Sequence, residues 1–96
     1  MTKFDIQAAA RADLREIYAF SVDRFGRPVA DSYLLGLRGC FDRLLDFPAI
    51  GRIYPGVTPE IPVLSYRRHR VFYRVVDDQL LVVRILHERR NIGEKL

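Results

Sequence analysis

The stretch that decides the fold is Tyr66-Arg-Arg-His-Arg-Val-Phe-Tyr-Arg-Val-Val-Asp-Asp-Gln-Leu-Leu-Val-Val-Arg-Ile-Leu-His-Glu-Arg-Arg90. Two runs of β-branched and aromatic residues flank Asp77-Asp78-Gln79, a pattern that predicts an antiparallel hairpin. The second run, from Leu80 to Leu86, is apolar almost throughout, so we expect an inner strand that is covered on most of both faces. Because buried arginine is costly unless paired, the arginines in both strands predict that one hairpin face is open to solvent or to a partner.

The hairpin turn decides which side chains share a face. A two-residue turn at Asp77-Asp78 pairs Val76 with Gln79 and is the arrangement we favour, although the glycine that usually fixes such a turn is absent. A three-residue turn would regroup the side chains, since a one-residue slip moves every side chain of a strand to the opposite face. The favoured turn predicts one face with Val71, Tyr73, Val75, Leu80, Val82, Arg84 and Leu86, and another with Arg70, Phe72, Arg74, Leu81, Val83, Ile85 and His87.

The composition indicates one ordinary globular domain over residues 1–96, with 49% hydrophobic and 29% charged residues. No apolar run reaches the roughly 18 residues of a membrane span, and the N-terminus does not resemble a secretory signal. The single Cys40 cannot form an internal disulfide, which favours a reducing compartment. We therefore expect a cytoplasmic protein with no membrane partner.

The net charge of +4 is concentrated in the second half of the chain. Residues 1–48 carry seven basic and seven acidic residues, whereas residues 49–96 carry nine and five. Fourteen of the sixteen basic residues are arginine, whose planar fork suits paired contacts to carboxylate or phosphate. The excess indicates either an acidic partner or a solvated basic face.

Two helices are predicted between a first strand, Lys3-Phe4-Asp5-Ile6, and the rest of the chain. The first begins at Ala8 and ends before Gly26, and the second runs from about Pro28 to Leu45. The first buries the stripe Ala10, Leu14, Ile17, Tyr18, Ser21 and Phe25, while Arg11, Asp13, Arg15, Glu16 and Asp23 occupy its outer surface. The second buries Ala30, Tyr33, Leu34, Leu37, Phe41, Leu44 and Leu45.

The short connection at Gly26 and Arg27 predicts that the helices form an antiparallel hairpin. Gly36 and Gly39 each weaken the second helix by roughly 1 kcal/mol, which we attribute to close approach of the first helix. Cys40 beside them is expected to be a small core residue.

The remaining chain completes the expected fold. Residues 46–62 are rich in proline and glycine and are expected to be an irregular connection, and Pro62 to Tyr66 form a short strand that the proline limits to an edge or a strand start. Residues 91–96 form a polar tail. The fold class is therefore α+β, in the order β-α-α-β-β-β, with the helical hairpin packed on one face of a small, mostly antiparallel sheet.

Residues that could carry chemistry are few. We expect no metal site, because two histidines and one cysteine lack ligand spacing, and we expect no cofactor, because no glycine-rich phosphate loop is present. His87 shares a predicted face with Arg70, and the two could act as acid–base and charge-stabilising groups in RNA cleavage. The alternative is that His87 caps the end of the sheet and binds the backbone. No second proton-transfer group is evident.

Several segments together resemble ParE-type toxins of the ParE/RelE superfamily. These are Ala8-Ala9-Ala10-Arg11-Ala12-Asp13-Leu14-Arg15-Glu16-Ile17-Tyr18, Arg24-Phe25-Gly26, Phe41-Asp42-Arg43-Leu44, Phe47-Pro48-Ala49-Ile50-Gly51-Arg52, Tyr66-Arg67-Arg68-His69-Arg70-Val71-Phe72-Tyr73-Arg74-Val75 and Val83-Arg84-Ile85-Leu86-His87-Glu88-Arg89-Arg90. They occur in the right order over essentially the whole chain.

The resemblance implies the toxin of a bacterial type II toxin–antitoxin pair, which would inhibit DNA gyrase and be neutralised by a ParD-like antitoxin. RelE-like relatives are instead ribosome-dependent mRNA endonucleases, for which Arg70 and His87 would be the catalytic candidates. This chain departs from the nuclease pattern, since its sheet region has no lysine and no aromatic residue follows His87. We therefore expect a non-enzymatic inhibitor, keep the nuclease as the alternative, and consider a plain nucleic-acid-binding module a third reading, with direct nucleic-acid binding not expected.

Two surfaces are expected to carry the activity. Target-binding residues on the arginine-rich sheet face and the end of the chain are Arg70, Arg74, Arg84, Arg89 and Arg90. Antitoxin-binding residues around the helical hairpin are Leu14, Tyr18, Tyr33, Leu37 and Phe72, where an amphipathic segment would dock.

Overall fold

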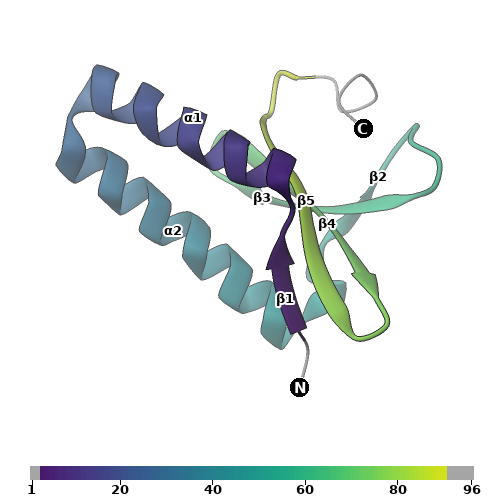
Figure 1. Cartoon of the computed structure of the whole chain (residues 1–96). Coiled ribbons are helices and arrows are strands. Elements are labelled where there is room, and N and C mark those ends of the chain that lie inside the picture. Colours follow the sequence, from purple (N-terminus) through teal and green to yellow (C-terminus); the bar gives the residue numbers. More distant parts are fainter. Residues whose placement is uncertain (1–2, 91–96) are drawn as a thin grey trace.

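A computed structural model of the chain describes residues 3–90, so the predicted tail at 91–96 lies outside the described residues. The elements in order are β1 (Lys3–Ile6), α1 (Ala8–Phe25), α2 (Arg27–Asp46), the short 3-10 helix η1 (Pro48–Ile50), β2 (Arg52–Tyr54), β3 (Ile61–Tyr66), β4 (His69–Val76) and β5 (Gln79–His87). The two helices form an antiparallel hairpin on one face of the sheet, as Figure 1 shows. The predicted fold class is confirmed.

The sheet has five strands in the order β1-β5-β4-β3-β2. β1 runs parallel to β5, and the other neighbouring strands are antiparallel. β5 is an inner strand, as its apolar run predicted. The connection at residues 46–62 is not irregular throughout, because it contains η1 and the edge strand β2. Three residues are too few to show an alternating pattern, so β2 is defined by its pairing with β3.

The connection from β4 to β5 is the two-residue turn that the sequence favoured. Val76 pairs with Gln79, and both turn residues have positive φ, 48° for Asp77 and 62° for Asp78. Aspartate tolerates this left-handed conformation better than most residues, because its short side chain can hydrogen-bond locally. A glycine is therefore not needed here.

A β-bulge in the middle of this hairpin overturns the predicted faces. Phe72 pairs with Arg84 while Tyr73 pairs with Val82, so Val83 has no partner residue in β4. An extra residue of this kind moves every later side chain of its strand to the other face. As a result Ile85 joins the helix-covered core with Val71, and Leu86 joins Phe72 on the opposite face. The prediction that His87 shares a face with Arg70 was wrong for the same reason.

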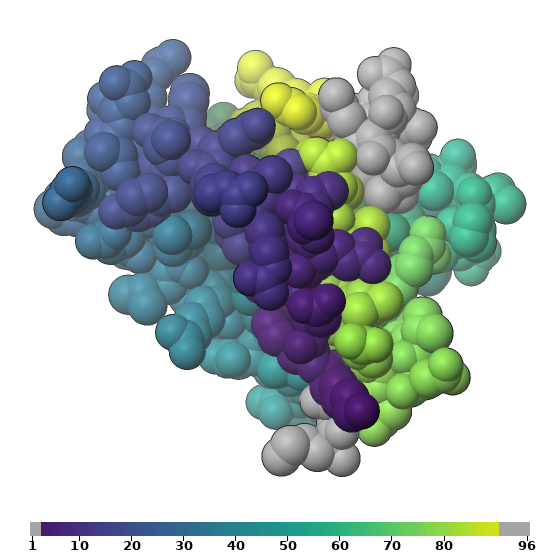
Figure 2. Space-filling view, in the orientation of Figure 1, coloured from purple at the N-terminus to yellow at the C-terminus, as the bar shows by residue number. Residues whose placement is uncertain are grey.

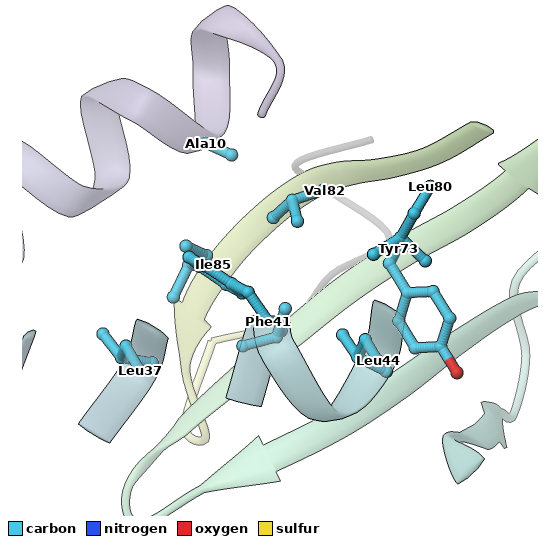
Figure 3. Close-up of a cluster of buried hydrophobic side chains, with 9 residues drawn as sticks. Ala10, Leu37, Phe41, Leu44, Tyr73, Leu80, Val82 and Ile85 are labelled. Carbon is cyan, nitrogen blue, oxygen red and sulfur yellow. The ribbon is translucent and has the colours of Figure 1, made fainter. Parts of the chain in front are cut away.

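The main core lies between the helical hairpin and the sheet. Its buried side chains are Ala10, Leu37, Phe41, Leu44, Val71, Tyr73, Leu80, Val82 and Ile85 (Figure 3). The predicted stripe of α2 is confirmed, and Cys40 is buried beside it as expected. The predicted stripe of α1 fails at its C-terminal end, where Phe25 is 63% exposed, because the closed end of the hairpin extends past the sheet (Figure 1).

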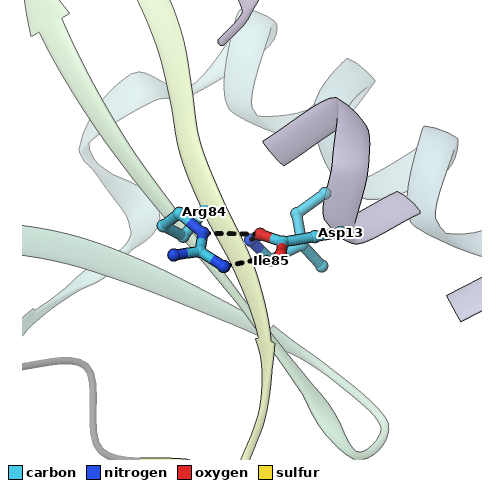
Figure 4. Close-up of polar contacts among 3 residues, drawn as sticks. All are labelled: Asp13, Arg84 and Ile85. Atoms are coloured by element: carbon cyan, nitrogen blue, oxygen red, sulfur yellow. Dashed lines mark hydrogen bonds and ion pairs between the residues drawn. The ribbon is translucent and has the colours of Figure 1, made fainter. Parts of the chain in front are cut away.

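Asp13 was expected on the surface of α1, yet its residue is only 6% exposed. β1 pairs with β5 only as far as Val82, and within residues 3–90 no strand lies beside β5 beyond that point on the same side. Asp13 takes the place of the missing strand. Its Oδ2 accepts the Ile85 backbone N–H at 2.9 Å, and its two oxygens accept the Arg84 guanidinium at 2.8 and 2.7 Å (Figure 4).

The arrangement places segments from opposite ends of the sequence side by side. Figure 2 shows β1 and α1, in purple and blue, lying against the yellow-green residues of β5. The contact is held by the β1–β5 ladder, by the backbone bond from Gln7 N–H to the Val82 carbonyl at 2.9 Å, and by Asp13.

The replacement Asp13→Ala is expected to destabilise the fold by about 3 kcal/mol, because it removes the carboxylate that accepts two hydrogen bonds from Arg84 and one from the Ile85 N–H. Urea unfolding followed by circular dichroism measures this change. Glu16→Ala, an exposed acidic residue one turn away on α1, is the control and should change stability by no more than about 0.5 kcal/mol. Equal effects of the two replacements would contradict the role given to Asp13.

The two glycines of α2 have different surroundings. A Cβ at Gly36 would overlap the hydroxyl and ring of Tyr66, whereas a Cβ at Gly39 would meet nothing within 4 Å. The prediction that both glycines bring α1 close was therefore wrong. Gly36 accommodates a tyrosine from β3, and Gly39 lies beside open space.

Alanine at the two positions should consequently act in opposite directions. Gly39→Ala is expected to stabilise the protein by about 0.5–1 kcal/mol, because the helix loses less backbone entropy on folding. Gly36→Ala is expected to destabilise it by about 1–3 kcal/mol through overpacking against Tyr66. Thermal unfolding of the two variants side by side gives the sign directly, and a stabilised Gly36→Ala variant would be inconsistent with the packing described here.

Candidate functional site

A groove of about 930 Å³ lies between the closed end of the helical hairpin and one end of the sheet. On the helix side it is lined by Phe20, Phe25 and Val29, whose exposures are 58%, 63% and 50%. On the sheet side it is lined by the β3–β4 turn and by the end of β5. Exposed aromatic and aliphatic side chains around a concave surface are typical of a docking site.

Three polar rings stand in a row along the wall of this groove, and we call them the histidine column: Tyr33 of α2, His69 of β4 and His87 of β5. The Tyr33 hydroxyl lies 2.5 Å from His69 Nδ1. The two imidazole rings meet edge to face, with centroids 5.5 Å apart, because His69 and His87 are directly paired across the hairpin. The column therefore connects the helical hairpin to both strands of the β4–β5 hairpin.

The surroundings of His69 favour its uncharged ring. Burial lowers the pKa of His69 below its ordinary value, and the neighbouring His87 lowers it further. Burial likewise raises the pKa of Tyr33, with a second contribution from Tyr66. His87 Nδ1 accepts the Arg89 backbone N–H at 3.2 Å, so that nitrogen carries a lone pair. The reading in which His87 caps the sheet and binds the backbone matches this geometry.

The proposed nuclease pair is not assembled in the structure. Arg70 donates to the Glu88 carbonyl at 2.9 Å and its guanidinium lies 5.7 Å from the Tyr54 ring centroid, on the face opposite the helices. His87 packs against His69 on the helix-covered face. The bulge thus separates two residues that a regular hairpin would have placed side by side.

The arginines of the expected target surface have different environments. Arg74 is on the same face as Arg70 and donates to the Glu60 carbonyl at 3.0 Å, and Arg89 and Arg90 are exposed in the turn after β5. Arg84 is instead engaged by Asp13, and its side chain is 16% exposed. A second apolar cluster of Ile61, Phe72 and Leu86 lies on the same face of the sheet as Arg70 and Arg74. That face therefore combines arginines with apolar side chains.

The expected antitoxin-binding residues divide in a similar way. Leu37 and Phe72 are 0% and 1% exposed and present no surface to a partner, which corrects their assignment. Leu14 packs against the core, and the Tyr18 hydroxyl donates to Asp31 at 2.9 Å. Only Tyr33 lines the groove. The sequence reasoning missed Phe20 and Val29, whose large apolar side chains outside the predicted stripes were the available signal.

Two absences apply to the described part of the chain. Within residues 3–90 no group of three or more histidine, cysteine or acidic side chains is placed to hold a metal ion. Neither helix of this part is long and apolar enough to cross a bilayer.

The lowered pKa of His69 makes stability depend on pH in a definite direction. The unfolded chain takes up a proton near the ordinary value of about 6.5, whereas the folded chain resists it until a lower pH. The stability is therefore complete above about pH 6.5 and decreases as the pH falls below it. His69→Gln keeps a hydrogen-bond acceptor for Tyr33 and removes this titration, so its unfolding midpoint should change less between pH 7.5 and 5.5. A steeper change in the variant would refute the assignment.

Comparison with known proteins now identifies the family. Residues 4–92 match the family model for the ParE toxin of the type II toxin–antitoxin system parDE. Toxin ParE1 of Mycobacterium tuberculosis (strain H37Rv) is 35% identical over 96 residues, which is 99% of this chain and 98% of the relative. Toxin ParE3 of Caulobacter vibrioides is 29% identical over 84 residues, covering 88% and 84% of the two chains.

Solved structures share the fold at lower sequence identity. A chain of the chromosomal ParDE system from P. aeruginosa superposes with a TM-score of 0.79 at 21% identity, covering 91% of this chain and 96% of that one. A chain of the intact E. coli RelBE toxin–antitoxin complex gives 0.61 at 19% identity, covering 94% and 100%. The chain described here belongs to the ParE toxin family of type II toxin–antitoxin systems.

Proposed function

We propose that this ParE-family toxin acts in the cytoplasm as a non-enzymatic protein inhibitor of DNA gyrase, and that a ParD-like antitoxin neutralises it. The observation that carries this choice over RNA cleavage is the separation of Arg70 and His87 onto opposite faces of the sheet. General acid–base catalysis requires its groups to reach the same reacting atoms. A protein that inhibits by binding needs only a surface that fits its target.

The groove is the proposed antitoxin-binding site. The solved structures that share this fold include a ParDE system and a RelBE toxin–antitoxin complex. The exposed apolar side chains Phe20, Phe25 and Val29 around a concave surface suit the apolar face of an amphipathic segment. Leu14, Tyr18 and Tyr33 remain from the expected contact residues, because each keeps some exposed surface, and Tyr33 lines the groove itself.

The target-binding surface that we propose consists of Arg70, Arg74, Arg89 and Arg90. The first two project from β4 on the face away from the helices, and the last two follow the end of β5. Arg84 is left out, since a residue held in an ion pair by Asp13 would have to give up that pair to bind a target. Exposed arginine suits an acidic protein surface.

Ribosome-dependent mRNA cleavage is the second candidate function. The observation that favours it is the gathering of His69, His87, Arg68 and Arg90 around one groove, where a histidine and arginines could meet a phosphate. In this reading Arg70 would contribute by binding RNA rather than by acting beside His87.

Inducible expression in bacteria, with and without the small gene beside the toxin gene, distinguishes the two functions. Gyrase inhibition predicts growth arrest with intact transcripts and reduced supercoiling, relieved by the second gene. Codon-phased transcript cuts with normal supercoiling would replace this proposal by the nuclease, and His87→Ala would then abolish the cuts.

The target-binding surface is tested by the double replacement Arg89→Ala/Arg90→Ala. We expect at least a tenfold loss of supercoiling inhibition, because two exposed charges of the contact are removed. Arg15→Ala/Arg38→Ala, which removes two exposed arginines from the helices, is the matched control and should keep full inhibition. Undiminished inhibition by a folded Arg89→Ala/Arg90→Ala protein would remove this surface from the proposal.

A further inference from the structure

Both histidines of the chain meet in the wall of the groove. The sequence contains two histidines, and these are His69 and His87, paired across β4 and β5 with ring centroids 5.5 Å apart. Histidine is the side chain whose ordinary pKa lies closest to physiological pH. Both imidazoles of the chain therefore lie at the surface where a partner would dock.

The hydrogen bonds of the column are better made with neutral rings. The Arg89 backbone N–H points at His87 Nδ1, so a proton on that nitrogen would place two donors against each other. A charged His69 would instead donate from Nδ1 to the Tyr33 hydroxyl, 2.5 Å away. Tyr33 could then donate only to the Tyr66 carbonyl, which at 3.5 Å is a long hydrogen bond.

Charged and titratable groups face the column from the helices and from the strands. From the helices come Asp13, already in its ion pair with Arg84, together with Glu16 and Tyr33. From the strand side come Tyr66, Arg67, Arg68, Glu88 and Arg90. Burial and then His87 lower the pKa of His69, whereas Asp13 and Glu88 raise it. Burial is the largest of these effects, so the net direction favours the uncharged His69 ring.

We infer that the groove binds its occupant only while His69 and His87 are both uncharged, so that acidification releases the occupant. The occupant is the amphipathic antitoxin segment, and to that extent the inference rests on the proposed function. A segment lying over the column removes water from both rings, and loss of water penalises the charged form of an imidazole. Binding below pH 6.5 must therefore expel protons.

Proton linkage sets the size of the effect. Each proton that binding expels weakens the affinity by up to tenfold for every pH unit below the pKa of the unbound group. At the ordinary histidine pKa of about 6.5, expulsion of one or two protons gives a loss of at most about tenfold or a hundredfold between pH 7.5 and 5.5, and the lowered pKa of His69 reduces its share. If carboxylates of the antitoxin segment lay against the rings, the affinity would instead rise in acid. The direction of the change in affinity therefore tests the inference.

The experiment titrates the full-length toxin with the protein encoded by the adjacent small gene, by calorimetry at pH 7.5, 6.5 and 5.5. Buffers of different ionisation enthalpy count the protons released. We expect proton release and a loss of affinity of tenfold or more at pH 5.5. A constant affinity, or one that rises in acid, would overturn the inference.

Variants of the two histidines separate this effect from other titrations. His69→Gln and His87→Phe keep an acceptor for Tyr33 and an aromatic ring in the column, respectively, and the double variant should bind at pH 7.5 with a nearly flat pH profile. An unchanged pH profile in the double variant would also overturn the inference. If the double variant does not fold, each single replacement should remove part of the proton release.

A second probe keeps the inference testable if the proposed function fails. N-phenyl-1-naphthylamine is an uncharged apolar dye whose fluorescence increases in apolar surroundings, and it requires no antitoxin. With the toxin alone its affinity should also fall below pH 6.5, and Phe20→Ser should abolish binding if the dye occupies the groove. Absence of antitoxin binding at pH 7.5 would refute the proposed function, whereas a dye affinity that does not change with pH would refute the proton coupling.

Discussion

The carboxylate of Asp13 holds the structure together at the point where its sheet is incomplete. β1 ends beside Val82, and the edge of β5 continues past it. An uncovered strand edge leaves backbone groups without partners and invites association with other chains. Asp13 satisfies the Ile85 N–H and, through the Arg84 guanidinium, neutralises its own charge. α1 is thereby fixed against the last strand, and the groove beyond it acquires a defined wall.

The bulge at Phe72/Tyr73 determines what this molecule can do. Without it, His87 and Arg70 would lie on one face as a catalytic pair, and Ile85 would be lost from the core. With it, the final residues of β5 reverse their faces, so that Ile85 closes the main core and His87 joins the groove. A single extra residue in one strand therefore separates the arginine face from the histidine column.

The two faces of the sheet consequently serve different partners in the proposed function. The face with the helical hairpin ends in an apolar groove with titratable polar rings in its wall, which suits a segment that docks and is released. The opposite face carries arginines above the small cluster around Phe72, which suits a charged protein surface.

The sequence by itself determined both helices, the strands other than β2, their order and the family resemblance. Helical spacing defined α2 and most of α1, the apolar run defined β5, and the Asp77-Asp78 turn was found from the strands on either side. These features depend on neighbours within about four residues, so the pattern along the chain contains them. The same holds for Cys40, whose place in the stripe of α2 already indicated burial.

Only the tertiary structure decided which of these residues meet. From the sequence alone Asp13 is expected on the surface of a helix. Its burial depends on its contact with the part of β5 that extends beyond the end of β1. The bulge, the short β2 and the contact of Tyr66 with Gly36 are likewise set by pairing between distant segments. The local sequence does not predict such pairing, because it is stabilised by packing and hydrogen bonds between distant segments that form only in the folded chain. The candidate site, built from residues of both helices and of β3, β4 and β5, is therefore a property of the fold.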